Sequence, residues 1–490
     1  LIRVSDLTFA YDGSYDNVFE KASFQLDTSW RTGLVGRNGR GKTTFLRLLQ
    51  GKYAYSGAIS ANVDFEYFPY EVPDENAFGI EVVREIAPQA EDWEINRELS
   101  LLDVSEDALW QSFCFLSGGE KTKLLLAALF LRSNSFLLLD EPTNHLDAEA
   151  RRKIGDYLCK KSGFILVSHD RELLDKCTDY TISLNKTSID VEKGSFSVWY
   201  ENKCNRDEYE IRENKRLKKE IKSLEAAARR ASDWSYKAEK GKFNTTNSGV
   251  SVDRGYVGHK AAKMMKKAKV IENRSLAAAE EKEELLKDVE ISDSLKITPL
   301  TYFSEQIAAL DKVSVSYGDK TVCENISFSI HRGDRIALQG RNGCGKSSIL
   351  KLIAGENITY GGNLVRSERL IVSYVKQDSS GISGSLSDYA KKYSVDENLL
   401  RAILSKMDVP YTQFFKDISC YSEGQKKKLM LARSLCQQAH LYIWDEPLNY
   451  IDIFSRIQLE ELILKYCPTI IFVEHDSVFT EKIATDIVVL

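Results

Sequence analysis

Two glycine-rich segments, one near residue 40 and one near residue 345, share the same spacing of residues. In each, Gly-x-x-Gly-x-Gly-Lys precedes a hydroxyl-bearing residue and follows a short apolar segment, at 32–35 or at 335–338. Closely spaced glycines between a strand and a helix let backbone N–H groups turn toward phosphate oxygens. The lysine then neutralises phosphate charge, and the hydroxyl is placed to bind Mg²⁺. The predicted phosphate-binding residues are Gly36, Asn38, Gly39, Gly41, Lys42, Thr43 and Thr44 in the first loop, and Gly340, Asn342, Gly343, Gly345, Lys346, Ser347 and Ser348 in the second.

A second repeated element is an apolar segment that ends in Asp-Glu. Asp140 and Glu141 follow the segment 136–139, and Asp445 and Glu446 follow the segment 441–444. At the end of a buried strand we expect the aspartate to face a metal ion and the glutamate to polarise the attacking water. These acids could instead be structural groups at strand ends. Their common offset from the two phosphate loops favours nucleoside triphosphate hydrolysis.

Composition indicates a large globular protein without a membrane span. The chain has 490 residues, of which 43% are apolar and 28% charged, enough for two to four domains with full cores. No apolar run reaches 18 residues, and the segment 1–7 resembles a strand more than a secretory signal. Nine scattered cysteines indicate reduced, mostly buried thiols, not a disulfide framework or a metal site. We expect a cytoplasmic protein.

One segment carries a charge opposite to that of the rest of the chain. Residues 212–274 contain 18 lysines and arginines against seven acidic residues, whereas the whole chain has a net charge of −5. A localised basic stripe on an acidic protein indicates contact with a polyanion. The alternative is a solvated helix whose charges only maintain solubility.

The basic segment lies within a predicted helical insertion between the two repeats. Residues from about 206 to about 286 contain no proline and are rich in Lys, Glu, Ala and Leu. A seam at 4-3-4-3 spacing and a loop composition at 241–258 predict an antiparallel helical hairpin, with arms of ~30–35 residues that project the loop by ~45–50 Å. The predicted seam consists of Leu217, Ile221, Leu224, Ala228 and Ala231 in the first helix, with Met264, Ala268 and Ile271 in a second helix from about 259 to 288. Aromatic residues near the loop could stack on unpaired bases: Trp234, Tyr236, Phe243 and Tyr256.

With these motifs, the chain resembles the ABC ATPase superfamily over nearly its whole length. The segments 116–120 and 421–425 are similar to the family's signature loop, which in the family completes the ATP site of the opposite domain. The resemblance implies that the nucleotide is ATP. It assigns His169 and His475 the role of the switch histidine, and Tyr11 and Tyr317 the role of the aromatic residue that stacks on adenine. It further implies nucleotide contacts from Ser117, Gly118, Gly119, Ser422, Gly424 and Gln377, and Mg²⁺ ligation by Thr43, Asp140, Ser347, Gln377 and Asp445.

The predicted fold class is α/β, with two tandem ABC-type P-loop ATPase domains joined by a long antiparallel α-helical hairpin. We expect a first ATPase domain at 1–200, a helical linker at 201–300 with its tip at about 241–258, and a second ATPase domain at 301–490. Two ATP molecules and Mg²⁺ are expected between paired domains of one monomer.

The resemblance narrows to the ABC-F class, because two ATPase domains and a helical linker stand on one chain without a membrane domain. The segments 143–147, 258–266 and 444–452 look most like Lsa/Vga-type antibiotic-resistance proteins. The resemblance implies binding at the E site of the bacterial 70S ribosome, with the linker directed toward 23S rRNA and the P-site tRNA. It also implies protection from lincosamides, pleuromutilins and streptogramin A, with ATP hydrolysis allowing release.

Two departures from the superfamily pattern fall in one predicted site. Glu423 stands where the second signature usually has glycine, and Tyr70 stands where the first domain usually offers glutamine. In a head-to-tail pair of domains, Lys42 and Tyr70 share a site with Ser422. A carboxylate near the γ-phosphate repels it unless the side chain turns away. We therefore expect slower or weaker turnover in the Lys42 site.

Three alternatives remain open at this point. A translation factor that acts on stalled ribosomes would differ only in what the linker tip does. An ATP-gated DNA repair or chromosome-organising ATPase also joins such domains to coiled coils, but usually has a longer coil or zinc cysteines. The third alternative is the motor half of a transporter, in which the basic hairpin has no role.

Overall fold

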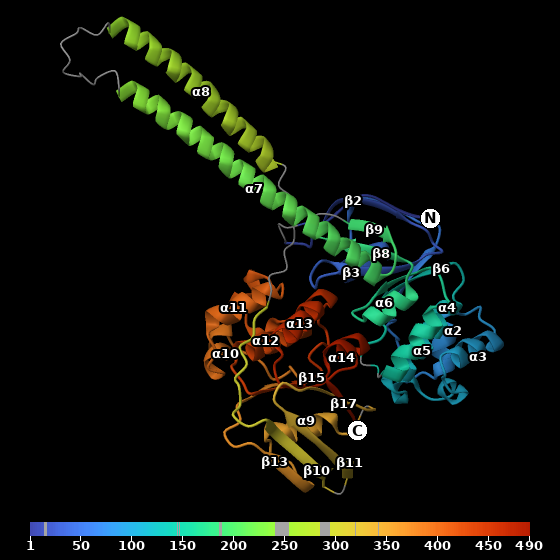
Figure 1. The fold of residues 1–490 in the computed structure, drawn as a ribbon. Coiled ribbons are helices and arrows are strands. Elements are labelled where there is room, and N and C mark those ends of the chain that lie inside the picture. Colours follow the sequence, from blue (N-terminus) through green and yellow to red (C-terminus); the bar gives the residue numbers. More distant parts are fainter. Residues whose placement is uncertain are drawn as a thin grey trace. The chain divides into compact units, whose positions relative to one another are not determined.

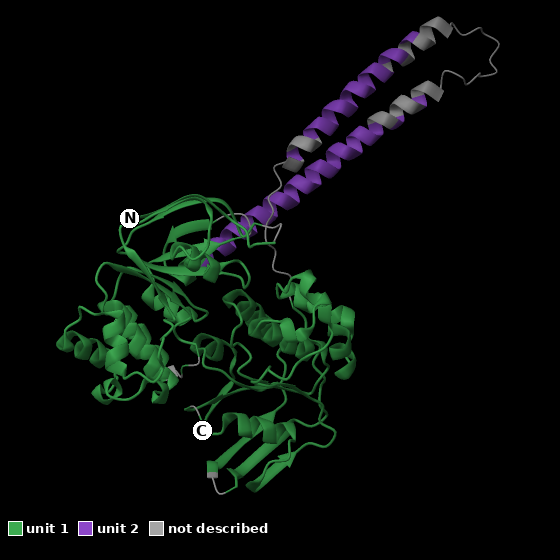
Figure 2. Ribbon diagram, turned by 180° about the vertical axis from the view of Figure 1, so that it is seen from behind, with its two compact units in different colours: residues 1–199, 292–490 green, residues 200–291 purple. Residues whose placement is uncertain are grey.

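The computed structural model describes residues 1–13, 17–144, 146, 148–185, 189–240, 254–284, 295–318, 320–341 and 343–490. Asn342, the segment 241–253 and the side chains of Trp234, Tyr236 and Tyr256 lie outside what it describes. The chain forms two compact units, residues 1–199 with 292–490, and residues 200–291 (Figure 2). Both predicted ATPase halves belong to the first unit, and the predicted linker accounts for the second.

The first half is built around a sheet whose central strands are parallel. Its six strands have the order β5-β6-β7-β3-β8-β9, and only the β8–β9 pair is antiparallel. The strands are β3 (Arg31–Gly36), β5 (Asp64–Phe68), β6 (Ser135–Asp140), β7 (Phe164–Val167), β8 (Tyr180–Leu184) and β9 (Ile189–Lys193). A smaller antiparallel sheet has the order β2-β1-β4, formed by β1 (Ile2–Phe9), β2 (Phe19–Leu26) and β4 (Ser56–Ser60).

The helices of the first half follow the motifs found in the sequence. A helix begins at Lys42, directly after the first phosphate loop, and another begins at Gly118, directly after Ser117. The helices are α1 (Lys42–Leu49), α2 (Gly79–Ile86), α3 (Asp92–Leu101), α4 (Gly118–Leu131), α5 (Ala148–Leu158) and α6 (Arg171–Cys177), with short 3₁₀ turns at Glu106–Leu109 and Phe113–Phe115. Phe45 and Leu46 of α1 are fully buried in the core between the two sheets.

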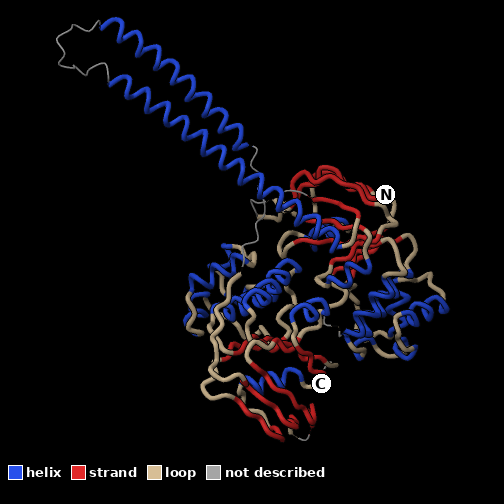
Figure 3. The backbone as a smooth tube through the Cα atoms, viewed as in Figure 1, coloured by secondary structure: helices blue, strands red, loops and turns tan. Residues whose placement is uncertain are grey.

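The second half repeats this topology (Figures 1 and 3). Its parallel sheet has the order β14-β15-β16-β12-β17, which matches β5-β6-β7-β3-β8, and its small sheet has the order β11-β10-β13. The strands are β10 (Gln306–Tyr317), β11 (Lys320–His331), β12 (Arg335–Gln339), β13 (Tyr360–Arg366), β14 (Val372–Val375), β15 (Leu441–Asp445), β16 (Ile470–Val473) and β17 (Asp486–Val489). The helices are α9 (Lys346–Ala354), α10 (Leu386–Lys392), α11 (Glu397–Lys406), α12 (Glu423–Cys436), α13 (Ile453–Tyr466) and α14 (Ser477–Ile483), with 3₁₀ turns at Tyr411–Phe415 and Ile418–Cys420.

The parallel strands bring the chemical motifs of each half to one edge of its sheet. Asp140, the last residue of β6, is level with Val167, the last residue of β7. In the second half, Asp445 is level with Val473 in the same way. The phosphate loops leave this same edge, because β3 and β12 run parallel to β7 and β16. Carboxyl ends of parallel strands are where α/β proteins bind ligands.

The second unit contains two long helices that lie side by side (Figures 1 and 2). The helix α7 spans Phe196–Lys240, 45 residues, and α8 spans Arg254–Glu284, 31 residues. The predicted helical hairpin insert is therefore present. Because α8 begins at Arg254, the last five residues of the predicted loop are helical, and the exact domain boundaries remain a prediction.

The described side chains of the predicted seam are mostly buried, whereas those of Ala231 and Met264 lie outside what the structure describes. Leu217, Ile221 and Ala228 on α7 and Ala268 on α8 are each less than a tenth exposed. Ile271 was predicted to lie on the same stripe but is 50% exposed, although its spacing of three from the buried Ala268 would suit the seam. An ion pair between Lys282 of α8 and Glu220 of α7 fixes the antiparallel register. None of the helices among the described residues combines the length and hydropathy needed to span a bilayer.

A buried ion pair holds the helical part of the second half in place. The Lys428 ammonium donates to Asp452 Oδ2 at 2.7 Å and to the Met407 carbonyl at 2.6 Å. The other carboxylate oxygen of Asp452 accepts from the backbone N–H of Ser455 and caps α13. The lysine side chain is 2% exposed and the aspartate is fully buried, so removing one charge leaves the other without a partner in a medium of low polarity.

We expect Lys428→Met to lower the free energy of unfolding by about 3 kcal/mol or more, because the Asp452 carboxylate then loses its counterion while it remains buried. The matched control is Arg84→Met, which removes an exposed ion pair with Asp92 and should cost less than about 1 kcal/mol. Denaturant-induced unfolding of both variants measures the difference. Equal destabilisation would show that the buried pair contributes no more than a surface pair.

Candidate nucleotide-binding and hydrolysis sites

Both phosphate loops have the backbone shape that the sequence predicted. Gly41 and Gly345, at the N-caps of α1 and α9, have φ of 88° and 99°, values that favour glycine. A Cβ atom at Gly41 would also lie 2.6 Å from Val18 Cγ1. Helix N-termini preceded by such turns expose N–H groups to an anion.

The two loop lysines lie across their own loops. The Lys42 ammonium donates to the Gly36 carbonyl at 2.7 Å, and the Lys346 ammonium donates to the Gly340 carbonyl at 2.8 Å. Each lysine therefore holds its positive charge where the loop N–H groups converge, the position in which a phosphate group is neutralised. This arrangement fits a nucleoside triphosphate in both halves.

A hydroxyl and a carboxylate meet beside each loop. Thr43 Oγ1 donates to Asp140 Oδ2 at 2.7 Å, and Ser347 Oγ donates to Asp445 Oδ1 at 3.2 Å. Hydroxyl and carboxylate oxygens are the hard ligands that Mg²⁺ prefers, so the residues present fit a magnesium ion. The predicted magnesium-binding pairs are thus brought together in both halves.

A tyrosine that the sequence analysis missed lies behind each of these aspartates. The Tyr67 hydroxyl donates to Asp140 Oδ2 at 2.9 Å. Burial, and then the Asp140 charge, raise the pKa of Tyr67, while burial and Asp445 raise the pKa of Tyr374. Both tyrosines stay protonated, and Tyr67 can orient Asp140, whereas the buried Tyr374 hydroxyl has no hydrogen-bond partner among the described residues. The sequence offered one sign of these tyrosines: Tyr67 lies three residues before Tyr70, and Tyr374 lies three residues before Gln377.

The predicted catalytic glutamates each face a histidine. His169 Nε2 lies 3.3 Å from Glu141 Oε1, and the backbone N–H of His169 donates to Glu141 Oε2 at 3.3 Å. In the second half, His475 Nε2 lies 3.8 Å from Glu446 Oε1. A second missed residue, Asn449, donates from its side-chain amide to Glu446 Oε2 at 2.6 Å.

Charges around the first glutamate favour the neutral forms of both partners. Burial, and then repulsion by Asp140, raise the pKa of Glu141 to about 8, although Lys42 and Arg456 oppose this. Burial, and then Lys42 and Arg456, hold the pKa of His169 well below its usual range. Arg456 belongs to the second half, so the first site already includes groups from the opposite domain.

The predicted adenine-stacking tyrosines are positioned beside the loops. The Tyr11 hydroxyl lies 2.6 Å from Thr44 Oγ1, and the Tyr317 hydroxyl donates to Ser348 Oγ at 3.2 Å. The two tyrosines are 45% and 49% exposed, so a base can still reach the rings. Adenine stacking by these two rings stays a prediction.

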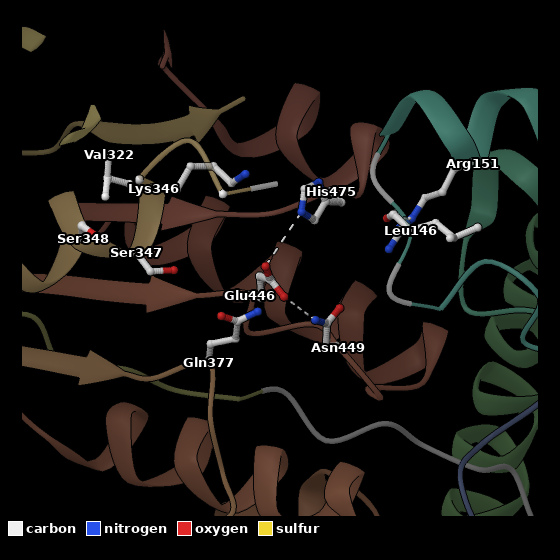
Figure 4. Close-up of a pocket in the computed structure, with 12 residues that line it drawn as sticks. Leu146, Arg151, Val322, Lys346, Ser347, Ser348, Gln377, Glu446, Asn449 and His475 are labelled. Carbon is white, nitrogen blue, oxygen red and sulfur yellow. Dashed lines mark hydrogen bonds and ion pairs between the residues drawn. The ribbon is translucent and has the colours of Figure 1, made fainter. Parts of the chain in front are cut away.

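The Lys346 site opens into a cavity of about 430 Å³ (Figure 4). Gln377, Glu446 and His475 line it from the second half, and Leu146 and Arg151 line it from the first half. The first signature lies in a neighbouring cavity, of about 470 Å³, which shares Leu146. That second cavity is lined by Ser117, Gly118 and Gly119 among other residues. The structure thus brings the first signature near the Lys346 site but not into the same cavity.

Second-half groups contact the first phosphate loop directly. The Asn38 side-chain amide donates to the Tyr450 carbonyl at 3.0 Å, and Arg37 forms an ion pair with Asp408. A Cβ atom on Gly424, beside Ser422 in the second signature, would lie 3.5 Å from Asn38 Nδ2. The structure therefore places the second signature, which was the predicted head-to-tail partner of Lys42, beside the first phosphate loop.

Glu423 turns away from the phosphate side, as its charge requires. Its carboxylate accepts a hydrogen bond from Ser379 and forms an ion pair with Lys426 at 3.0 Å. The hydrogen bond from Ser379, followed by that from Lys426, lowers the pKa of Glu423 and keeps it ionised. The repulsion of a γ-phosphate is thereby weakened, although the side chain remains half-exposed.

Tyr70 does not take the place of the missing glutamine. Burial, and then the charge of Glu85 on α2, raise the pKa of Tyr70, and Glu66 and Arg132 are its other charged neighbours. Glu66 and Arg132 form an ion pair at 3.1 Å, away from Asp140. The Lys42 site thus lacks the side-chain amide that Gln377 brings to the Lys346 cavity.

Comparisons with known proteins agree with this geometry. The family described as "ABC transporter" matches residues 19–144 and 323–449, together more than half of the chain. Both matches contain a phosphate loop and an Asp-Glu pair, so each half accounts for a complete copy of the family pattern.

Relatives match the chain over nearly its whole length. ATP-binding protein Uup from Buchnera aphidicola subsp. Acyrthosiphon pisum is 28% identical, covering 99% of this chain and 79% of that protein. Ribosome protection protein VmlR from Bacillus subtilis (strain 168) is 27% identical, covering 96% of this chain and 84% of that protein. Probable ATP-binding protein YheS from Escherichia coli (strain K12) is 25% identical, covering 94% of this chain and 74% of that protein.

Solved structures show the same fold. The archaeal ribosome recycling factor aABCE1, in complex with the archaeal ribosomal stalk protein aP1, superposes with a TM-score of 0.64 at 18% identity. That match covers 99% of this chain and 87% of the other. RNase-L Inhibitor gives a TM-score of 0.61, also at 18% identity.

The raised pKa of Glu141 predicts a pH-dependent effect of its replacement. In the unfolded chain this carboxyl has a pKa of 4.5, so below pH 4.5 it is protonated in both the folded and the unfolded protein. The stability that the folded protein gains from holding this proton is lost as the pH rises through about 8. Because Gln mimics the protonated form, we expect the melting temperature of Glu141→Gln to exceed that of the wild type increasingly between about pH 5 and about pH 9. Differential scanning calorimetry measures the difference. A difference that stays constant with pH would contradict the burial argument.

Two copies of one chemical site, each with a phosphate loop, an oxygen pair for a metal ion and a glutamate beside a histidine, are arranged on two copies of one α/β fold. Together with the family match, this arrangement shows that the chain belongs to the ABC transporter family and is an ATPase.

Proposed function

We propose that this protein is an ABC-F ATPase of the ribosome-protection type. It binds the bacterial 70S ribosome at the E site and relieves inhibition by antibiotics of the peptidyl transferase centre, of lincosamide, pleuromutilin and streptogramin A type. The observation that carries the proposal is the likeness to the ribosome protection protein VmlR, which extends through both ATPase halves and the helical insert between them.

The charge of the helical insert supports an RNA partner. Its basic side chains on α7 and α8 are exposed, so their charge is available to a polyanion. Among the described side chains, the exposed basic residues are Arg206, Arg212, Lys215, Arg216, Lys218, Lys219, Lys222, Arg229, Arg230 and Lys237 on α7, and Lys263, Lys266, Lys267, Lys269 and Arg274 on α8. The proposed contacts are 23S rRNA and the P-site tRNA, with residues of the insert's tip nearest the drug.

ATP acts in this proposal as a clamp between the two ATPase domains, one at 1–200 and one at 301–490. Thr43 with Asp140, and Ser347 with Asp445 and Gln377, would hold Mg²⁺, which would supply positive charge against the phosphates. Glu141 and Glu446 orient the attacking water, and His169 and His475 hold these glutamates in place. Loss of the γ-phosphate removes contacts to both signatures, so the domains separate and the protein leaves the ribosome. The proposed location is the cytoplasm, on ribosomes.

A second candidate is a translation factor that acts on stalled ribosomes without drug specificity. ATP-binding protein Uup, which is similar over 99% of this chain, is named for ATP binding alone, so likeness to such relatives does not require drug specificity. The two candidates share the ATPase cycle and the ribosome, and differ in whether drug susceptibility changes.

We expect the two glutamates to contribute unequally to hydrolysis. The Lys42 site lacks the amide that Gln377 supplies to the Lys346 cavity, and its signature carries the Glu423 carboxylate, whose charge Ser379 and Lys426 offset only in part, so its turnover should be the slower. Steady-state ATPase assays should show a larger loss for Glu446→Gln than for Glu141→Gln. The control is Glu423→Gly, which restores the usual signature residue and should raise the activity that remains in Glu446→Gln. Equal losses would remove the support for unequal sites.

The double variant Glu141→Gln/Glu446→Gln should co-sediment with 70S ribosomes in sucrose gradients only when ATP is present, because the clamp then closes but cannot open. Charge reversal of Lys263, Lys266 and Lys267 in this background should abolish co-sedimentation and preserve ATP binding. The matched control reverses Lys391, Lys392 and Lys416, exposed lysines of the second ATPase half, and should keep it.

Growth assays separate the two candidates. Expression in a susceptible bacterium should raise the inhibitory concentration of at least one of the three drug classes, and the Glu141→Gln/Glu446→Gln variant should not. Ribosome binding without any change in susceptibility would support the translation factor. Absence of ribosome binding, with ATP binding intact, would overturn both candidates.

A further inference from the structure

Two cysteines of the first ATPase half lie next to each other. Cys159 follows the last residue of α5, and Cys177 is the last residue of α6. Their sulfur atoms are 3.6 Å apart, which is van der Waals contact between thiols. The sequence predicted scattered, reduced cysteines and gave no sign of this pair, because the two residues become neighbours only when α5 packs on α6.

The two thiols are held toward each other by backbone carbonyl groups. Cys159 Sγ donates to the Lys176 carbonyl at 3.2 Å, and Cys177 Sγ donates to the Gly155 carbonyl at 3.3 Å. Each thiol thus bonds to the helix that carries the other thiol. Because a disulfide bond holds its sulfur atoms about 2 Å apart, the two sulfur atoms, now 3.6 Å apart, must approach by about 1.6 Å to form it.

The two sulfur atoms differ in accessibility and share a basic neighbourhood. Cys177 is fully buried, and burial raises its pKa well above the usual range. Cys159 is only partly buried, so a reagent from solution meets it first. Arg31 donates to the Cys159 carbonyl at 2.8 Å, and Lys176, whose carbonyl accepts from Cys159 Sγ, is a charged neighbour of both thiols.

We propose that Cys159 and Cys177 form an oxidisable dithiol, which a small-molecule disulfide such as glutathione disulfide converts into an intramolecular disulfide bond. The Cys159 thiolate attacks one sulfur of the reagent, forms a mixed disulfide and releases one thiolate of the reagent. Cys177 then loses its proton and attacks the Cys159 sulfur, which releases the second reagent thiol. Two protein thiols are oxidised, and one small disulfide is reduced to two thiols.

The modification is confined to the first ATPase half. In the second half, the matching positions at the ends of α13 and α14 are Leu464 and Ile483, which cannot form the bond. Because α5 and α6 follow the Asp-Glu pair and the histidine of the same half, the bond would tie together two helices that leave the Lys42 site. Thermal stability of the first half should rise, since the bond closes a loop in the unfolded chain.

The test treats the full-length, reduced protein with glutathione disulfide and maps its peptides by mass spectrometry without reduction. We expect a peptide pair linked through Cys159 and Cys177, with the loss of two hydrogens and no glutathione attached to either residue. The linked protein should also melt several degrees higher than the reduced protein, and a reducing agent should reverse this shift.

Single variants identify the order of the two steps. Cys177→Ser should keep a stable glutathione adduct on Cys159, whereas Cys159→Ser should leave Cys177 unmodified. The matched control is Cys467→Ser, which removes an exposed cysteine next to α13 and should leave the linked peptide unchanged. A wild-type protein in which Cys159 carries only glutathione, or in which both cysteines remain free, would overturn the proposal.

Discussion

The parallel register of the central strands is the constraint on which both sites depend. Because Asp140 is level with Val167, the next residue, Glu141, can donate its backbone N–H to the Val167 carbonyl at 2.9 Å. That bond brings Glu141 within reach of His169, two residues beyond the end of β7. A slip of one residue in this pairing would turn every side chain of the strand to the opposite face and separate the two groups.

The same register forces a conformation that is costly for a glutamate. Glu141 and Glu446 have φ of 52° and 45°, in the left-handed region, which costs on the order of 1–2 kcal/mol for a residue with a Cβ atom. The bond from Glu446 N–H to the Val473 carbonyl, at 3.1 Å, helps to hold this conformation in the second half. Positive φ also recurs at other matched positions, such as Asp103 and Asp408 with φ of 55° and 58°, so this strain belongs to the repeated fold, which uses it to place the two glutamates.

Features that depend on the spacing of residues along the chain could be predicted from the sequence. Phosphate loops, Asp-Glu pairs and the helical insert are local patterns, and the structure contains them where they were expected. The partners of Glu423 could not be predicted, because Ser379 is brought to it only by folding. The contacts of Asn38 and Arg37 with the second half are hidden in the sequence for the same reason. Ile271 was misplaced because an apolar residue on a two-helix hairpin can face either the seam or water.

The inequality of the two sites follows from how the halves share their parts. Burial lowers the pKa of Lys42, and the attraction of Asp452, which belongs to the second half, is the largest effect that opposes it. The charge state of the first site thus depends on a residue that is itself fixed by Lys428 in the opposite half. In the Lys346 cavity, the first half contributes Leu146 and Arg151, while its signature lies in the neighbouring cavity. The contact of the second signature with the first phosphate loop is therefore the basis for the prediction that the departures at Glu423 and Tyr70, which lie in different halves, affect one nucleotide site.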